Sequence, residues 1–220
     1  IDEERIAPLL ADVQDRIDTL PPEQIAPWLE QAKVAVDPAT FVKLWSITMA
    51  LNKVAEENPD RGLQRRKQYE LAAGGTSPSI DEFLLNNTAE CAEMAAFAQV
   101  AMQKSGVSSK LVNGSVLLDK NWEYGEEHSY NYIDVEGRPL IYDPANPIPT
   151  GWDDGQPRVL PRIMSAPADF LANIRNPAQK CFIECTDVYG NKPVYYGVND
   201  GASVFNVMSS EPAGENSLEG

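Results

Sequence analysis

The stretch EEHSYNYIDVEGRPLIYDPANP, which runs from Glu126 to Pro147, predicts a β-hairpin around which the rest of the fold can be arranged. Polar and apolar residues alternate up to Val135, the dipeptide Glu136-Gly137 follows, and an aliphatic run begins soon after it. Such a pattern around two turn residues, one of them glycine, is typical of a hairpin with a two-residue turn. We therefore expect two antiparallel strands joined at residues 136–137.

The register of this hairpin decides where the chain's only histidine lies. Counted outward from a two-residue turn, Tyr130 faces Asp143 and His128 faces Ala145. His128 and Asp143 then become diagonal neighbours on one face, with Cα atoms about 7–8 Å apart, and the carboxylate can accept a hydrogen bond from the imidazole. A three-residue turn would instead place the two side chains on opposite faces.

The charge and hydropathy of the chain exclude several functions. The 220 residues carry a formal net charge of −15, with nine basic against sixteen acidic residues in 1–90 and nine against seventeen in 91–220. Two acidic halves argue against nucleic-acid binding, and the one basic cluster, RRK at 65–67, is expected on the solvent side of a helix. No apolar run approaches the roughly 18 residues that a membrane span needs, and no signal-peptide pattern opens the sequence. We expect neither a nucleic-acid nor a membrane partner.

Three cysteines, an odd number, do not form a disulfide framework. Cys181 and Cys185 lie in a strand-like run, and four residues of strand span about 13 Å, which is too far for a disulfide. These two are expected to be small buried hydrophobic residues. Cys91 differs, because Thr88 is the expected N-cap of an alanine-rich helix and Cys91 then falls in its first turn.

A helix N-terminus favours a reactive thiol. Its unpaired N–H groups and its dipole stabilise a thiolate and can also hold an oxyanion. Glu90 and Glu93 oppose this effect by adding negative charge nearby. The alternative is a buried structural cysteine, since CAEMAAFA would bury an apolar stripe in any case.

The chain divides at a segment rich in glycine and serine. Helical patterns fill the sequence before it, and an alanine-rich helix followed by six strand-like runs comes after it. The GGTSPS stretch at 74–79 is the predicted boundary. We expect an N-terminal helical subdomain or extension at 1–78, a core at 79–210 and a flexible tail at 211–220. A helix followed by several strands is typical of an α+β fold.

Cys91, His128 and Asp143 supply a nucleophile, a base and an orienting carboxylate in a workable order. The stretches that contain them, CAEMAAFAQVAMQKSGVSSKLVNG, HSYNYIDVEG and LIYDPANP, resemble the Cys, His and Asp boxes of the transglutaminase-like superfamily, a branch of the papain-like cysteine enzymes. The matching part runs from about Asn86 to Pro147, under a third of the chain. The resemblance implies a papain-like/transglutaminase-like core, in which the helix that carries the cysteine packs on an antiparallel sheet.

The resemblance also implies a role for each residue. Cys91 would be the nucleophile, His128 the general base and then the general acid, and Asp143 the orienting carboxylate. The backbone N–H of Cys91 would form half of an oxyanion hole, with the side chain of Asn86 or Asn87 as the candidate for the other half. The chain departs from the family just before the nucleophile, where a glutamate replaces the usual glycine.

The expected reaction is acyl transfer from a peptide bond or a glutamine side-chain amide to Cys91, through a thioester. Water as the acceptor gives a thiol protease or a glutamine deamidase, a lysine amine gives a transglutaminase, and we favour hydrolysis of a protein substrate. The acidic surface would suit a basic partner. Trp122 and Tyr124 either line the acyl groove or pack on the core as loop aromatics. No cofactor is expected, and the protein is expected in the cytoplasm or secreted as an effector.

The alternatives differ in the residues that they require. An arylamine N-acetyltransferase has a related core, but its glycine-rich run before the cysteine is absent here. One histidine and three scattered cysteines offer no zinc-ligand spacing, and the acidic pair at 153–154 lies in no recognisable calcium loop. A catalytically silent transglutaminase-like protein-binding module would keep the scaffold without its chemistry. An electrophile that reacts much faster with Cys91 than with Cys181 and Cys185 would distinguish an enzyme from such a module.

Overall fold

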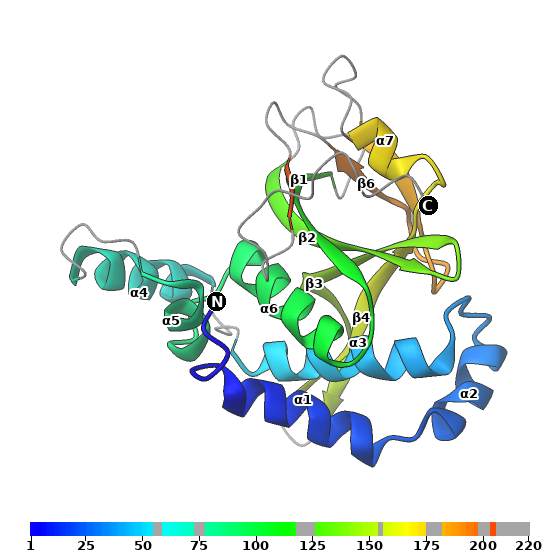
Figure 1. Ribbon diagram of the computed structural model, residues 1–220, viewed down its shortest axis with the longest axis horizontal. Coiled ribbons are helices and arrows are strands. Elements are labelled where there is room, and N and C mark those ends of the chain that lie inside the picture. The colour runs from blue at the N-terminus through cyan, green and yellow to red at the C-terminus, as the bar shows by residue number, and fades with distance from the viewer. Residues whose placement is uncertain are drawn as a thin grey trace.

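The computed structural model describes residues 1–54, 59–72, 78–117, 126–153, 156–174, 182–197 and 203–205. Helices come mostly before the strands along the chain (Figure 1). The helices are α1 (Ala7–Thr19), α2 (Pro22–Gln31), α3 (Pro38–Asn52), α4 (Pro59–Ala72), α5 (Ile80–Leu85), α6 (Cys91–Lys104) and α7 (Phe170–Ile174). The strands are β1 (Ser109–Leu117), β2 (Glu126–Val135), β3 (Arg138–Asp153), β4 (Gln156–Ser165), β5 (Phe182–Asp187), β6 (Val194–Gly197) and β7 (Ser203–Phe205).

The strands form a closed antiparallel barrel. Neighbouring strands are paired in the order β2-β3-β4-β5-β6-β1. β1 also pairs with β2, and this last pairing closes the six strands into a barrel. The short β7 pairs with β1 beside β6. The expectation of a papain-like/transglutaminase-like core, with its helix on an open sheet, is therefore wrong, because β1 is paired along both of its edges.

Two glycines let the closing strands approach one another. A Cβ atom on Gly114 of β1 would lie 2.5 Å from the carbonyl oxygen of Gly197, and a Cβ on Gly197 of β6 would lie 2.5 Å from Phe182. A side chain at Gly114 would meet the backbone of β6 and push β1 and β6 apart, which is a recurring reason for glycine inside a strand, whereas a side chain at Gly197 would displace the Phe182 ring. The strand-like runs alone do not mark these glycines as closing points.

The hairpin predicted at residues 126–147 is confirmed. β2 and β3 pair without a shift as far as Asn131 opposite Tyr142. Both turn residues, Glu136 and Gly137, have positive φ angles, of 53° and 77°. Positive φ at both central positions is the conformation of a type I′ turn, whose twist matches that of the flanking strands.

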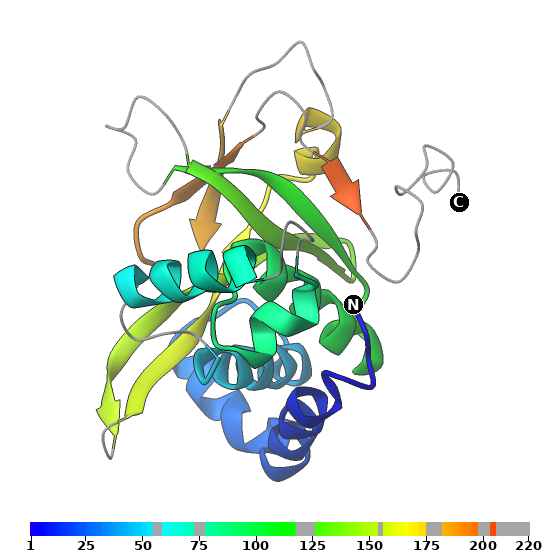
Figure 2. The same cartoon turned by 90° about the vertical axis from the view of Figure 1, so that its left-hand side faces the viewer.

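β4 was not predicted from the sequence. Pro157 and Pro161 interrupt its apolar pattern, and proline is disfavoured inside strands because it lacks an N–H. The β3–β4 pairing accommodates them with two register shifts. The end of this ribbon extends away from the barrel (Figure 2), and α3 supports it where Trp45 Nε1 donates to the Val159 carbonyl at 3.1 Å.

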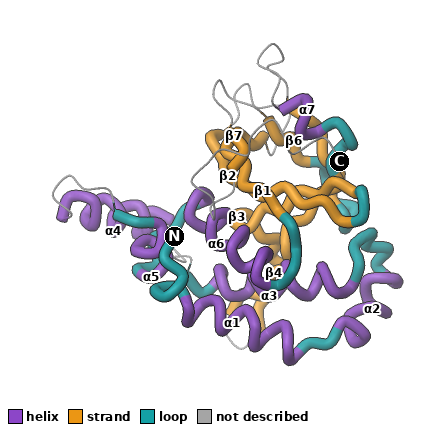
Figure 3. The backbone as a smooth tube through the Cα atoms, viewed as in Figure 1, coloured by secondary structure: helices purple, strands orange, loops and turns teal. Residues whose placement is uncertain are grey.

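Apolar residues gather on both faces of the strands. Inside the barrel the largest are aromatic: Tyr130, Tyr132, Phe170 and Tyr196. Outside it, α6 packs on β1, β2 and β3 and also contacts α3 and α5 (Figure 3). This outer core joins the helices to the barrel through residues such as Phe41, Leu44, Phe97 and Ile133.

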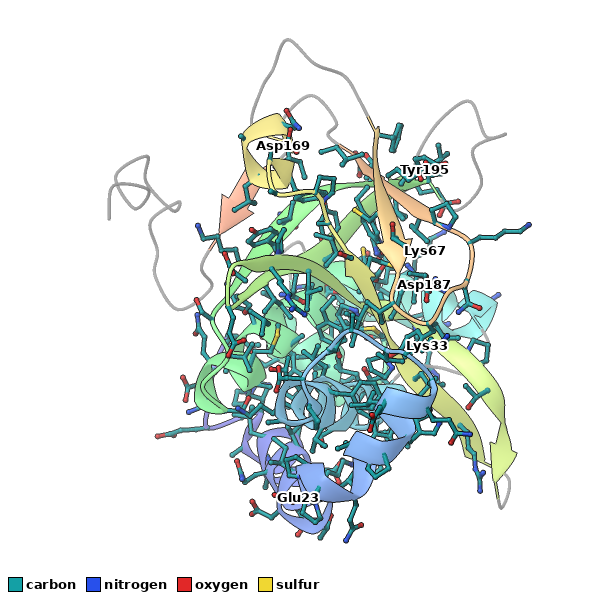
Figure 4. The ribbon with its side chains drawn as sticks, turned by 90° about the vertical axis from the view of Figure 1, so that its right-hand side faces the viewer. Glu23, Lys33, Lys67, Asp169, Asp187 and Tyr195 are labelled. Atoms are coloured by element: carbon teal, nitrogen blue, oxygen red, sulfur yellow. The ribbon has the colours of Figure 1, made fainter. Side chains whose placement is uncertain are left out.

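α2 and α7 lie at opposite ends of the molecule. Figure 4 shows Glu23 of α2 at one end and Asp169, just before α7, at the other.

α3 begins at a cap, because the Asp37 carboxylate accepts from the Thr40 N–H at 2.9 Å. Among the residues described, no helix is long and apolar enough to cross a membrane.

Candidate active site

Cys91 is the first residue of α6. The N-cap is Glu90 rather than the expected Thr88, and the Glu90 N–H donates to Glu93 Oε2 at 2.8 Å. Thr88 is buried, and its hydroxyl donates to the Phe83 carbonyl at 3.3 Å, at the end of α5. The helix therefore starts two residues later than predicted, which places the half-buried Cys91 at its very N-terminus.

His128 and Asp143 form the diagonal pair that the hairpin register predicts. His128 Nε2 lies 2.9 Å from Asp143 Oδ1, and the two residues are only 8% and 0% exposed. Both belong to the strand face that looks into the barrel, the face that also carries Tyr130. Because Nε2 donates to the carboxylate, the other ring nitrogen, Nδ1, remains for a second partner.

Further donors hold the second oxygen of the carboxylate. Tyr196 and the Asn146 amide both donate to Asp143 Oδ2 at 3.0 Å. Asn146 Nδ2 also lies 3.2 Å from His128 Nε2, but both atoms are donors directed at the carboxylate, so we assign no hydrogen bond between them. Arg162 Nε donates to the Asn146 carbonyl at 2.6 Å and fixes this irregular part of β3, where the pairing with β4 shifts between Asp143 and Ile148. Burial raises the pKa of Asp143, but the charge of His128 and these hydrogen bonds outweigh it and lower the pKa.

The Cys91 thiol completes the series. Burial raises the pKa of Cys91, but the neighbouring His128, its charge and the backbone of Ser129 outweigh burial, and the pKa is lowered. Burial lowers the pKa of His128, but the charge of Asp143 and the bonds to Asp143 and Cys91 raise it to about 10. Cys185 has the opposite shift, because burial raises the pKa of its thiol to about 12.

The predicted oxyanion-hole residues lie at the α5–α6 connection. The first helical bond of α6 runs from Met94 N–H to the Glu90 carbonyl at 3.0 Å, so the N–H of Cys91 precedes the helical ladder. Asn86 donates its amide to the Glu82 carbonyl at 2.7 Å, and Asn87 follows α5 with a φ of 54°. Both asparagines thus help to end α5, and a contribution from either to an oxyanion hole stays a prediction.

Some predicted residues lie outside the described part of the chain. These are the groove candidates Trp122 and Tyr124, Cys181, Asp154 and the tail at 211–220. Cys91 and Cys185 are free thiols. Within the described residues, no group of three or more histidine, cysteine, aspartate or glutamate side chains is placed to hold a metal ion.

A groove of about 480 Å³ lies away from this site. Its lining includes Glu4, Leu10 and Lys104, between α1 and the C-terminal end of α6. α6 has 14 residues and rises about 1.5 Å per residue, so the groove lies roughly 20 Å from Cys91. It has no part in the chemistry of the thiol.

Two residues of the site were missed from the sequence. Tyr196 belongs to a strand-like run that carries no mark of function, and only the closed barrel brings it to Asp143. Asn146 lies three positions after Asp143 in the DPANP stretch. This closeness in sequence to a predicted triad carboxylate could have indicated that Asn146 binds it.

Comparison with known proteins gives no match: no protein-family model matches the chain, and no curated protein or solved structure is significantly similar to it. The likeness to the transglutaminase-like superfamily accordingly rests on the three sequence stretches alone.

Proposed function

We propose that this protein is a cysteine-dependent acyl-transfer enzyme that acts on protein amide bonds. The observation that carries the proposal is the buried hydrogen bond from His128 to Asp143, with the Cys91 thiol close enough to His128 for the imidazole to lower its pKa. The pKa of the thiol is lowered and that of the imidazole is raised to about 10, which favours a thiolate beside an imidazolium at neutral pH. Nucleophilic cysteines have this signature, whereas buried structural cysteines have the opposite one.

The reaction follows from the arrangement. The Cys91 thiolate attacks the amide carbonyl, and the oxyanion that forms is stabilised by the free N–H at the start of α6. The His128 imidazolium gives its proton to the departing nitrogen, the carbon–nitrogen bond breaks, and an acyl thioester and an amine or ammonia result. The neutral imidazole then takes a proton from water or an acceptor amine as it attacks the thioester. Collapse releases the acyl product and restores the thiolate and the imidazolium.

Asp143 acts through His128. Its ionised carboxylate keeps the proton on Nε2 and directs Nδ1 toward the thiol, and it stabilises the imidazolium. Asn146 and Tyr196 in turn keep the carboxylate ionised and fixed in a buried position.

The acceptor decides the outcome. Water gives a thiol protease when the acyl donor is a peptide bond and a deamidase when it is a glutamine side chain, whereas a lysine amine gives a transglutaminase. We favour hydrolysis of a protein substrate. The likeness of the three sequence stretches to the transglutaminase-like superfamily supports acyl transfer without choosing the acceptor.

Hydroxylamine provides a test that does not depend on the acceptor, because it converts any acyl thioester to a hydroxamate. Glutamine-rich casein is incubated with hydroxylamine and the wild-type protein, Cys91→Ala, or Cys185→Ala as the matched control. We expect casein hydroxamates with the wild type and with Cys185→Ala, and none with Cys91→Ala. Equal yields with all three proteins would contradict the proposal, and no yield above a protein-free blank would favour the silent binding module. Mass spectrometry of the modified positions then separates glutamine side chains from cleaved peptide bonds.

A further inference from the structure

The first turn of α6 carries negative charge close to the nucleophile. Glu90 precedes Cys91 directly, and Glu93 follows it by two residues. Carboxylates at these positions oppose formation of a thiolate. Glu93 is only 6% exposed, so solvent screens its charge poorly. Without a nearby cation, this negative charge would oppose the effect of His128, which lowers the pKa of the thiol.

Arg66 of α4 supplies that cation. Its two terminal nitrogens bind the two oxygens of Glu93, each at 3.1 Å. One of these nitrogens also lies 3.8 Å from Glu90 Oε2. A bidentate pair between guanidinium and carboxylate fixes direction as well as charge, which an ammonium group cannot do.

The same side chain ties together the connection that leads into Cys91. Arg66 donates to the Thr88 carbonyl at 3.3 Å, and its guanidinium lies 3.9 Å from the centre of the Phe83 ring. Glu93, held by Arg66, accepts in turn from the Glu90 N–H at 2.8 Å. The backbone that leads into the nucleophile is thus connected, directly at Thr88 and through the Glu93 side chain at Glu90, to one side chain of α4.

The sequence placed the RRK cluster at 65–67 on the solvent side of a helix. This is wrong for Arg66, whose side chain is only 18% exposed, whereas its neighbour Lys67 is exposed. Figures 1 and 2 show α4 beside α5, on the side of the molecule where the connection to α6 begins. Arg66 is therefore directed at the start of α6, and Lys67 offers a matched cation on the same helix.

We propose that Arg66 is a positioning residue for Cys91 and acts through Glu93. The ion pair cancels the carboxylate charge in the first turn of α6 and holds the backbone that leads into the nucleophile. The proposal rests on the proposed function, since it assumes that Cys91 reacts as a thiolate. It makes α4, which contributes no atom to the triad, part of the support for catalysis.

The test removes the two charges of the ion pair singly and together and measures the effect on one thiol, that of Cys91. The rate of Cys91 alkylation by iodoacetamide is measured against pH by peptide mass spectrometry. The proteins compared are the wild type, Arg66→Gln, Glu93→Gln, the double variant and the control Lys67→Gln. Circular dichroism monitors folding. Below the thiol pKa, the alkylation rate is proportional to the thiolate fraction, which falls tenfold for each unit by which the pKa rises.

Arg66→Gln leaves the Glu93 carboxylate without its cation and should raise the pKa of Cys91 by about 0.5 to 1 unit, which slows alkylation at acidic pH about three- to tenfold. Glu93→Gln keeps the cation and should leave the pKa equal to or below that of the wild type. The double variant should return close to the wild type, and Lys67→Gln should leave the profile unchanged.

An unchanged Cys91 profile in folded Arg66→Gln would overturn the proposal, and so would a pKa of Cys91 raised in Glu93→Gln. If Arg66→Gln does not fold, Glu93→Gln and the double variant still decide, since a raised pKa in either contradicts the charge argument. A double variant as slow as Arg66→Gln would mean that Arg66 only packs. If wild-type Cys91 itself reacts like a free thiol, the proposed function fails, and that outcome is distinct from all of these.

Discussion

The hydroxyl of Tyr196 donates to Asp143 Oδ2 across 3.0 Å, although 53 positions separate the two residues in the sequence. Asp143 lies on β3 and Tyr196 on β6, which are opposite strands of the six that close the barrel. Both side chains are fully buried. The bond therefore crosses the barrel interior, and closure of the barrel contributes directly to the candidate active site.

Removing this hydroxyl tests the contribution. Tyr196→Phe keeps the ring and deletes one donor to a buried carboxylate, so we expect a loss of about 1–3 kcal/mol in the free energy of unfolding. Alkylation of Cys91 at acidic pH should also slow, because a less stabilised carboxylate holds the imidazolium less firmly. Urea unfolding and the alkylation rate measure the two effects. The control is Tyr195→Phe, which loses only an exposed bond to Glu184 and should stay within about 0.5 kcal/mol of the wild type.

Asp143→Asn tests the orienting carboxylate. The amide has the same size but no charge, so the imidazolium loses its partner and the pKa of Cys91 should rise toward the roughly 8.5 of a free thiol. Hydroxamate formation should fall about 10²- to 10⁴-fold. Asp134→Asn is the control, since the Asp134 side chain accepts from the Gly137 N–H in the hairpin turn, away from the imidazole. Wild-type activity in Asp143→Asn would exclude a triad.

The raised pKa of His128 has a consequence for stability. The folded value is about 10 and the unfolded value about 6.5. A raised pKa stabilises the fold fully below about pH 6.5, and the contribution is lost as the pH rises through about 10. The difference in unfolding free energy between the wild type and His128→Gln should therefore shrink from about pH 6 to about pH 10. A difference that stays constant over this range would mean that His128 is not held as an imidazolium.

The lowered pKa of Asp143 affects the unfolding free energy at acidic pH. A depressed carboxyl pKa contributes stability that is present above the unfolded value of about 3.9 and is lost as the pH falls through the lower folded value. The unfolding free energy of the wild type relative to Asp143→Asn should fall below about pH 4. Acid titrations of the two proteins in urea measure this difference, and parallel curves would contradict it.

Gly114→Ala tests why the barrel closes. Its Cβ would lie 2.5 Å from the Gly197 carbonyl oxygen, so β1 and β6 must separate, at a cost of about 1–3 kcal/mol in unfolding free energy. The adjacent Ser115→Ala is the control. The buried Ser115 hydroxyl has no hydrogen-bond partner among the described residues, so its removal should cost little. Equal unfolding midpoints for the two variants would refute the role of Gly114.

The local parts of the site could be predicted from the sequence because they depend on short-range rules. A two-residue turn fixes the hairpin register, and the register alone brings His128 next to Asp143. The start of the cysteine helix was predicted within two residues, and the error arose because Glu90 rather than Thr88 serves as the cap.

The long-range parts could not be predicted, because no local pattern encodes them. Closure depends on the fit of Gly114 against Gly197, and the bond from Tyr196 depends on closure. The role of Arg66 depends on which side of α4 meets the start of α6. A basic run such as 65–67 is predicted to be exposed to solvent unless a buried partner of one of its residues is known.

The most direct test of the central claim is the alkylation rate of each cysteine by iodoacetamide from about pH 4 to about pH 9, in the wild type and in His128→Ala. If Cys91 and His128 form a thiolate–imidazolium pair, Cys91 reacts rapidly at acidic pH, Cys185 does not, and His128→Ala abolishes the difference. If Cys91 titrates near the roughly 8.5 of a free thiol in both proteins, the pair does not exist and the proposed acyl-transfer chemistry is wrong.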